Sequence, residues 1–179
     1  AFRAAETALV VLNGRAGVQI ETIKLWRRLN KRNKPRIAFI NRMNEDRASF
    51  ASCIADLEDK FQLPMVPVTI PMGEGAEFRG VINLIEMKAY FTPESGAEET
   101  QDAIPAEFQA TAEEYHARMI ETAALGDDEL TEKYLETEDL TIEEARKGLM
   151  EGLRDNRIVP VLSGAGLLGS GVQSLLNFL

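Results

Sequence analysis

The apolar residues of this chain form two kinds of pattern, short continuous runs and stripes of helical period. Residues 7–12, 36–40 and 158–162 are continuous runs rich in β-branched residues, which is typical of strands buried on both faces of a parallel sheet. Between the first two runs an apolar residue recurs about every three positions, which predicts a helix with one buried stripe. The stripe consists of Ile20, Ile23, Trp26 and Leu29.

A second amphipathic helix is expected after residues 36–40. Its buried face consists of Phe50, Ile54, Leu57 and Phe61. Linked strand and helix units of this kind imply parallel pairing with right-handed crossovers, and ligands bind at the carboxyl ends of the strands in such sheets. Asn13 and Asn41 occupy two of these ends.

The middle of the chain has a different pattern. Residues 65–70, 81–83 and 88–91 read as short strands of a separate small sheet, and a loop rich in Glu, Pro and Gly runs to about Pro105. Two or three helices are expected to cover that sheet. One carries the stripe Phe108, Ala112, Tyr115, Met119 and Ala123, and another begins at a capping box formed by Thr141 and Glu144.

Charge divides the chain at the same places. Residues 1–63 carry 12 Lys/Arg against 7 Asp/Glu, residues 64–157 carry 8 against 22, and residues 158–179 carry none. We therefore expect an α/β protein in which a parallel sheet of about three strands with flanking helices is interrupted by an inserted acidic α/β domain. The inserted domain is predicted at residues 64–157, between the two parts of the first domain at 1–63 and 158–179.

Composition excludes several classes of protein and site. No apolar stretch approaches the roughly 18–20 residues of a membrane span, and no signal peptide pattern is present, so we expect a soluble cytoplasmic protein. A single cysteine, Cys53, and a single histidine, His116, exclude an internal disulfide and a Cys/His zinc site. Because the first residue is alanine and a strand follows almost at once, we interpret the chain as a piece of a longer protein.

One motif carries specific chemistry. Asn41-Arg42-Met43-Asn44 follows a buried strand directly, at the place where nucleotide-binding P-loop proteins have Asn-Lys-x-Asp. There the asparagine joins neighbouring loops, the lysine stem lies along the base, and the aspartate accepts hydrogen bonds from two N–H groups of guanine. By itself this motif is weak, because a polar loop after a strand is common.

The remaining sequence resembles elongation factor G over nearly its whole length. The likeness rests on segments whose order and spacing match that family: Gly17-Val18-Gln19, 35–41, 80–83, 87–90, Glu114-Tyr115-His116, Ile158 with Pro160-Val161, and Gly171-Val172-Gln173 with Leu175-Leu176. The resemblance implies the guanine-recognising half of a GTPase domain, with the inserted domain called G′ between Asn41 and Gly164.

The resemblance assigns roles in base binding, residue by residue. Asn41 becomes the structural asparagine, Arg42 the cation beside the base and Asn44 the base-reading position. Asn44 replaces an aspartate, so an NH₂ donor faces a guanine donor, at a cost of about 1–3 kcal/mol. Xanthine has an acceptor at that position, so its binding should be weakened less. Arg42 can still stack along the base.

The second recognition loop also departs from the family pattern. Ala165, Gly166 and Leu167 align with Ser-Ala-Leu, whose backbone amides hold the guanine oxygen and whose serine braces the loop. Ser163 is the one nearby hydroxyl that could replace that serine. Two interpretations stay open: a divergent paralogue with relaxed nucleotide specificity, or an ordinary factor in which Glu45 or Asp46 supplies the carboxylate.

Other motifs are decoys or missing. Residues 164–169 match G-x-G-x-x-G, but only ten residues follow, too few for a dinucleotide-binding unit. The sequence has no G-x-x-x-x-G-K-[ST], no magnesium-binding threonine loop and no Asp-x-x-Gly segment. GTP or GDP and Mg²⁺ are therefore expected in the parent GTPase, with no catalytic or metal-binding residue in this segment.

The resemblance implies a role in the translocation step of protein synthesis, with the large ribosomal subunit and its basic stalk protein as partners of the acidic insertion. Neither a membrane nor a specific nucleic acid sequence is an expected partner. Two alternatives are a ribosomal-protection factor of the tetracycline resistance type and a non-enzymatic interaction module without nucleotide. The open edge of the strand at residues 7–12 also predicts self-association of the isolated segment.

Overall fold

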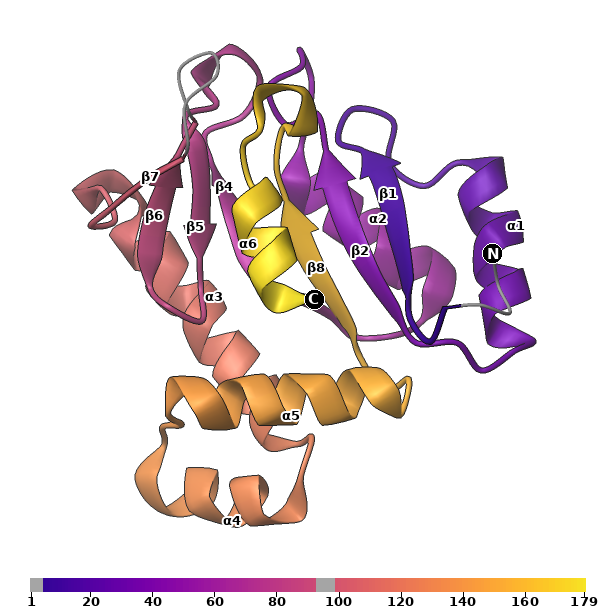
Figure 1. The fold of residues 1–179 in the computed structure, drawn as a ribbon, viewed down its shortest axis with the longest axis vertical. Coiled ribbons are helices and arrows are strands. Elements are labelled where there is room, and N and C mark those ends of the chain that lie inside the picture. Colours follow the sequence, from indigo (N-terminus) through magenta and orange to yellow (C-terminus); the bar gives the residue numbers. More distant parts are fainter. Residues whose placement is uncertain (1–4, 93–98) are drawn as a thin grey trace.

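The computed structural model describes residues 5–92 and 99–179, which form two β-sheets with helices packed around them (Figure 1). The strands are β1 Ala8–Asn13, β2 Arg36–Asn41, β3 Met65–Pro67, β4 Thr69–Met72, β5 Gly80–Asn83, β6 Lys88–Phe91, β7 Thr100–Asp102 and β8 Val159–Ser163. The α-helices are α1 Ile20–Asn30, α2 Phe50–Phe61, α3 Ala106–Ala124, α4 Asp128–Thr137, α5 Ile142–Arg154 and α6 Val172–Phe178, with 3₁₀ turns η1 Gly75–Glu77 and η2 Gly166–Leu168.

The first sheet is parallel, with strand order β1-β2-β8-β3. β1 and β2 run in register along their whole length, so that Asn13 lies opposite Asn41 at their carboxyl ends. β8 pairs with β2 on one side and with β3 on the other, which returns the last part of the chain to the middle of the sheet. The three strands predicted from apolar runs are confirmed, and so is the α/β class.

The parallel sheet has four strands, one more than expected, because the apolar run at residues 65–70 divides between the two sheets. Its first half, β3, pairs with β8, and its second half, β4, begins the other sheet. Val68 lies at the junction, where its N–H donates to the Val161 carbonyl (2.8 Å) and its own carbonyl accepts from Leu84 N–H (2.9 Å). A mostly apolar run does not show where the chain passes from one sheet to the other.

The second sheet is antiparallel, in the order β4-β5-β6-β7. The strands predicted at 81–83 and 88–91 are confirmed as β5 and β6. β7 was not predicted, because its three residues are polar and exposed and take strand geometry only by pairing with β6. Residues 93–98 of the expected loop lie outside the described residues.

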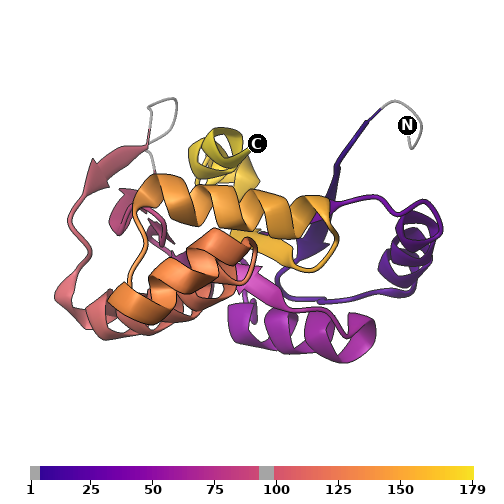
Figure 2. The ribbon, with the colours of Figure 1, turned by 90° about the horizontal axis from the view of Figure 1, so that it is seen from below.

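Helices cover both faces of the parallel sheet. α6 lies on one face, and α2 and α3 lie on the other (Figures 1 and 2). In α1, Trp26 and Leu29 are buried as predicted, but Ile20 is 71% exposed because it begins the helix beyond the packed stripe. Trp26 stacks on Phe61 of α2 with ring centroids 3.9 Å apart, which joins the two helices.

α3 runs along the sheets towards the amino-terminal end of the parallel sheet, and α5 and α4 lie beyond that end (Figure 1). The capping box that opens α5 is confirmed: the Thr141 hydroxyl accepts the Glu144 N–H, and Glu144 Oε2 accepts the Thr141 N–H (2.8 Å). One hydrophobic core runs through both sheets, so the division into separate domains at residue 64 stays a prediction. In the described part of the chain no helix is long and apolar enough to cross a membrane.

Candidate functional site

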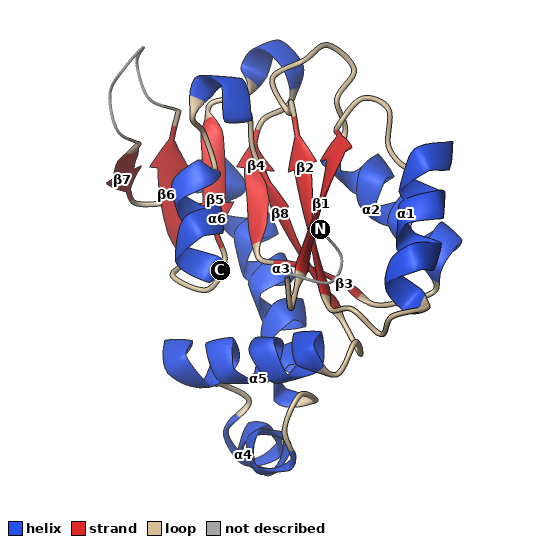
Figure 3. Ribbon diagram, turned by 45° about the vertical axis from the view of Figure 1, so that its right-hand side comes forward, coloured by secondary structure: helices blue, strands red, loops and turns tan. Residues whose placement is uncertain are grey.

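The two predicted base-recognition loops, residues 41–44 and 164–167, lie beside each other at the carboxyl end of the parallel sheet. The Gly166 N–H donates to Asn41 Oδ1 (2.8 Å), and the Met43 N–H donates to the Gly164 carbonyl (3.1 Å). The loops that follow β1, β2 and β8 all gather at this end (Figure 3). The pairing of β2 with β8 therefore brings together two segments far apart in the sequence.

Asn41 is fixed from several sides. Its carbonyl accepts the Gly14 N–H (2.8 Å), and its side-chain oxygen accepts the Arg42 N–H (2.8 Å) as well as that of Gly166. Arg42 has a φ of +65°, a left-handed conformation that turns the chain sharply out of β2. Asn41 thus joins the ends of β1, β2 and β8.

Below this junction, Cys53 of α2 is buried and its thiol donates to the Gly14 carbonyl (3.3 Å). Burial raises the pKa of the Cys53 thiol to about 11, with the nearby Asp56 carboxylate adding to the shift. A thiol of this kind stays protonated at neutral pH and is a poor nucleophile. Cys53 is a support for the loop after β1.

The side chains of Arg42 and Asn44 differ in how far they are exposed to solvent. The Arg42 guanidinium is largely exposed and forms an ion pair with Glu45 (2.9 Å). Asn44 is half-buried beside Met43, whose side chain is completely buried. The two carboxylates considered as substitutes for the family aspartate are both paired with arginines, Glu45 with Arg42 and Asp46 with Arg47 (3.5 Å).

The second loop is a closed turn. Ala165 is buried, its N–H donates to the Ser170 carbonyl (3.0 Å), and its own carbonyl accepts the Leu168 N–H (2.9 Å). Leu167 is fully exposed at the tip. The Gly166 N–H is one of the amides that the resemblance assigns to a guanine oxygen, and in this structure it donates to Asn41 Oδ1.

Ser163 does not replace the missing serine of the second loop. It is completely buried, its N–H donates to Thr69 Oγ1 (2.8 Å), and its hydroxyl lies 3.4 Å from the same Thr69 oxygen. The hydroxyl therefore bonds to β4 of the antiparallel sheet. The direction of a side chain in a buried strand is set by the pleat of the sheet. The short distance in sequence between Ser163 and Ala165 therefore did not reveal that Ser163 faces β4.

Two glutamates contact these loops although sequence reasoning assigned them no role. Glu74 Oε1 accepts the N–H of Phe50, the first residue of α2 (2.6 Å), and the next residue, Gly75, donates its N–H to the Met43 carbonyl (2.8 Å). Glu99 accepts the N–H groups of Gly171 (2.7 Å) and Gln173 (3.3 Å). No sequence signal identifies such pairs, because they depend on how the two sheets are placed together.

The arrangement suits a planar polar ligand and offers no hydrolytic machinery. Backbone amides and the amides of Asn41 and Asn44 are donors and acceptors for a base edge. Among the described residues no group of three His, Cys, Asp or Glu side chains is placed to hold a metal ion. The sequence contains no glycine-rich phosphate-binding motif of the type G-x-x-x-x-G-K-[ST].

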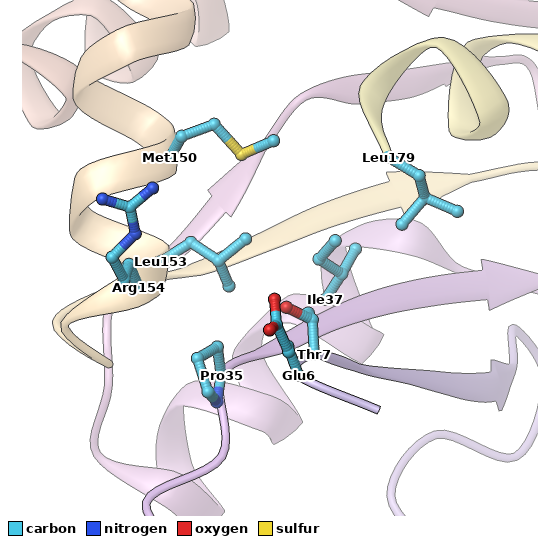
Figure 4. Close-up of a pocket in the computed structure, with 8 residues that line it drawn as sticks. All are labelled: Glu6, Thr7, Pro35, Ile37, Met150, Leu153, Arg154 and Leu179. Atoms are coloured by element: carbon cyan, nitrogen blue, oxygen red, sulfur yellow. The ribbon is translucent and has the colours of Figure 1, made fainter. Parts of the chain in front are cut away.

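A cavity of about 280 Å³ lies at the opposite end of the parallel sheet, between its amino-terminal side and α5 (Figure 4). Its walls include Glu6, Ile37, Met150, Arg154 and Leu179. Ligands of parallel α/β sheets bind at the carboxyl ends of the strands. This cavity is therefore separate from the base-recognition loops.

Comparisons of the sequence and of the structure with known proteins point to the same family. The description "Elongation factor Tu GTP binding domain" belongs to the family whose sequence profile matches residues 1–179. Elongation factor G of Thermotoga neapolitana is 39% identical over 178 residues, which are 99% of this chain and 26% of that protein. Elongation factor G of Thermotoga petrophila matches with the same identity and coverage.

A crystal structure of a protein from Thermus thermophilus has the same fold, with a TM-score of 0.85 and 30% sequence identity. The alignment covers 97% of this chain and 26% of that one. The chain thus spans about a quarter of the length of these relatives. It belongs to the elongation factor Tu GTP-binding domain family and is similar within it to elongation factor G.

Proposed function

We propose that this chain supplies the base-recognition half of the nucleotide site in a cytoplasmic, ribosome-associated translational GTPase. The observation that carries the proposal is the hydrogen bond from Gly166 to Asn41, which holds the two predicted recognition loops side by side. Asn41 joins the loops, Arg42 lies along the base, Asn44 reads the base edge, and Ala165, Gly166 and Leu167 line the opposite wall. GTP or GDP and Mg²⁺ are bound through phosphate by segments of the parent protein that this sequence does not include.

We propose further that guanine specificity is relaxed. Asn44 presents one carbonyl oxygen and one NH₂ group where the family has a carboxylate, so one guanine N–H meets a donor. Glu45 and Asp46 each form an ion pair with an arginine at the surface, and neither carboxylate is bonded to the second loop in the described structure. Xanthine has a carbonyl at the mismatched position and pairs with the Asn44 NH₂ group.

Calorimetric titration of the full-length protein with GDP and with XDP tests this specificity. We expect XDP to bind as tightly as GDP or up to about 100-fold more tightly, since a single mismatched hydrogen bond is worth on the order of 1–3 kcal/mol. A preference for GDP of several orders of magnitude would show that the site compensates for Asn44. Binding of neither nucleotide would favour the non-enzymatic interaction module.

The acidic insertion is the proposed contact with the ribosome. Residues 64–157 carry 8 Lys/Arg against 22 Asp/Glu, a field that attracts a basic protein and repels RNA. We propose the basic stalk protein of the large subunit as that partner. Sedimentation of the full-length protein with ribosomes at low salt tests the proposal, and a protein that stays in the supernatant at low salt would exclude this role.

A further inference from the structure

Two glutamates from the antiparallel sheet hold the ends of helices that begin at the predicted recognition loops. Glu74 follows β4 and caps α2, which begins six residues after Asn44. Glu99 precedes β7 and accepts the N–H groups of Gly171 and Gln173, where α6 begins after the second loop. The helix that follows each recognition loop is therefore held at its start by one carboxylate that comes from the inserted part of the chain.

The contact with the first loop includes more than the carboxylate. Ser49 caps α2 from its own sequence by accepting the Ser52 N–H, and Glu74 adds a second acceptor for Phe50. The Gly75 N–H donates to the carbonyl of Met43, which lies inside the first loop. The turn between β4 and η1 thus touches both ends of the segment that contains Asn44.

The contact with the second loop is also built from two interactions. Besides the two N–H groups held by Glu99, the Thr92 hydroxyl donates to the Ser170 hydroxyl (3.2 Å). Ser170 in turn exchanges backbone hydrogen bonds with Ala165 in both directions. Release of Glu99 or Thr92 therefore frees the stem of the turn that carries Gly166.

We propose that Glu74 and Glu99 are positioning residues that hold the two recognition loops in the geometry that receives the base, so that the insertion and the base site are coupled. A partner that displaces Glu74 or Glu99 would loosen the loops, and a bound base would in turn stabilise the insertion. This inference rests on the proposed base-binding role of the loops. The contacts of Glu74 and Glu99 with the starts of α2 and α6 do not depend on that role.

The test uses amide hydrogen exchange and nucleotide titration on the full-length protein and its variants Glu74→Ala and Glu99→Ala, which remove the acceptor oxygens. We expect exchange about three- to tenfold faster at Phe50 and Gly75 in the first variant and at Gly171 and Gln173 in the second, as for loss of a helix cap. GDP affinity should fall by a similar factor in both. Glu77→Ala, at an exposed glutamate of the same turn, is the matched control and should change neither quantity.

The amides of β2 distinguish local loosening from general destabilisation, because they should keep their wild-type exchange rates in all three variants. Unchanged exchange at both loops would overturn the proposal, and so would faster exchange with unchanged GDP affinity. A wild-type protein that binds neither GDP nor XDP would refute the proposed function instead. The exchange rates would still decide whether the two glutamates hold the loops.

Discussion

Asn41 Oδ1 accepts the backbone N–H of Gly166 at 2.8 Å, across 125 positions of sequence. The same oxygen accepts the Arg42 N–H, so one side chain fixes the conformation of its own loop and the position of the other. A Cβ atom at Gly166 would lie 3.3 Å from this oxygen, which makes the approach close. This amide adds a side-chain link to the backbone bond from Met43 N–H to the Gly164 carbonyl, which also joins the two recognition loops.

Replacement of Asn41 by alanine should loosen the contact between the loops. The variant loses two hydrogen bonds, each worth about 0.5–1.5 kcal/mol, and we expect a comparable fall in the free energy of unfolding together with weaker GDP binding. Asn41→Asp keeps an acceptor oxygen for both N–H groups and is the matched control. Urea unfolding and nucleotide titration measure both effects. Equal losses in the two variants would show that the acceptor oxygen is not what holds the loops together.

Asn44→Asp should restore the preference for guanine. An aspartate provides two acceptor oxygens for the two N–H groups of the base, and we expect GDP affinity to rise by about 10- to 100-fold relative to XDP. Asn44→Ala, which removes the acceptor and the donor together, should bind both nucleotides weakly. If aspartate left the ratio of GDP to XDP affinity unchanged, position 44 would not be the base-reading residue.

Most of the fold could be predicted from the sequence, because the period of the apolar residues reports the element directly. The runs at residues 7–12 and 36–40 and the stripe of Phe50 and Leu57 gave the strands and helix that the structure contains. β7 could not be predicted, since its polar residues become a strand only through pairing with β6. The change of sheet at Val68 was invisible for a similar reason: both sheets accept the same apolar residues.

For the candidate site, the sequence predicted which loops meet but not what surrounds them. Asn41 and Gly166 follow buried strands, so the rule for parallel sheets was sufficient to place them at one end. Glu99 was ordinary in sequence, a carboxylate in an acidic stretch. Burial raises its pKa while the N–H groups of Gly171 and Gln173 oppose that shift, and both effects arise only from tertiary placement.

Substitution of Gly171 and of Gly75 by alanine tests how much room the backbone has for a Cβ atom at each position. Both have left-handed φ values, +78° and +61°. A Cβ at Gly171 would lie 2.4 Å from the Ser163 carbonyl oxygen, whereas at Gly75 its nearest contact is 3.6 Å. We expect Gly75→Ala to destabilise by about 1–2 kcal/mol through conformation alone, and Gly171→Ala by about 3 kcal/mol or more. Similar losses in urea unfolding would mean that the second loop moves freely to accept a methyl group.

Glu144 should make the stability of the insertion depend on pH. The Lys133 ammonium, with the N–H and hydroxyl of Thr141, lowers the pKa of Glu144 from 4.5 to about 2. Because this pKa is depressed in the folded state, the contribution is fully present above pH 4.5 and is lost as the pH falls towards about 2. Glu144→Gln removes it.

Urea unfolding of the wild type and of Glu144→Gln between pH 2 and 7 measures the contribution, with the exposed neighbour Glu143→Gln as control. The stability difference between wild type and Glu144→Gln should shrink as the solution is acidified. A difference that stays constant over this range would show that the Lys133 pairing is not maintained in solution.

The edge strand β1 should govern self-association of the isolated segment. β1 is the outer strand of the parallel sheet in the described structure, and its side chains Leu9 and Val11 are 41% and 56% exposed. An unpaired apolar edge favours pairing with a second copy, which a charged side chain on that edge opposes. Val11→Lys should therefore shift the segment towards monomer in sedimentation equilibrium.

Leu135→Lys is the control, because it also introduces a lysine in place of an apolar residue, at a position of α4 that is 77% exposed. This variant should associate as the wild type does. Equal effects of the two substitutions would point to general charge repulsion, and a wild-type segment that stays monomeric throughout would show that the edge of β1 is not adhesive.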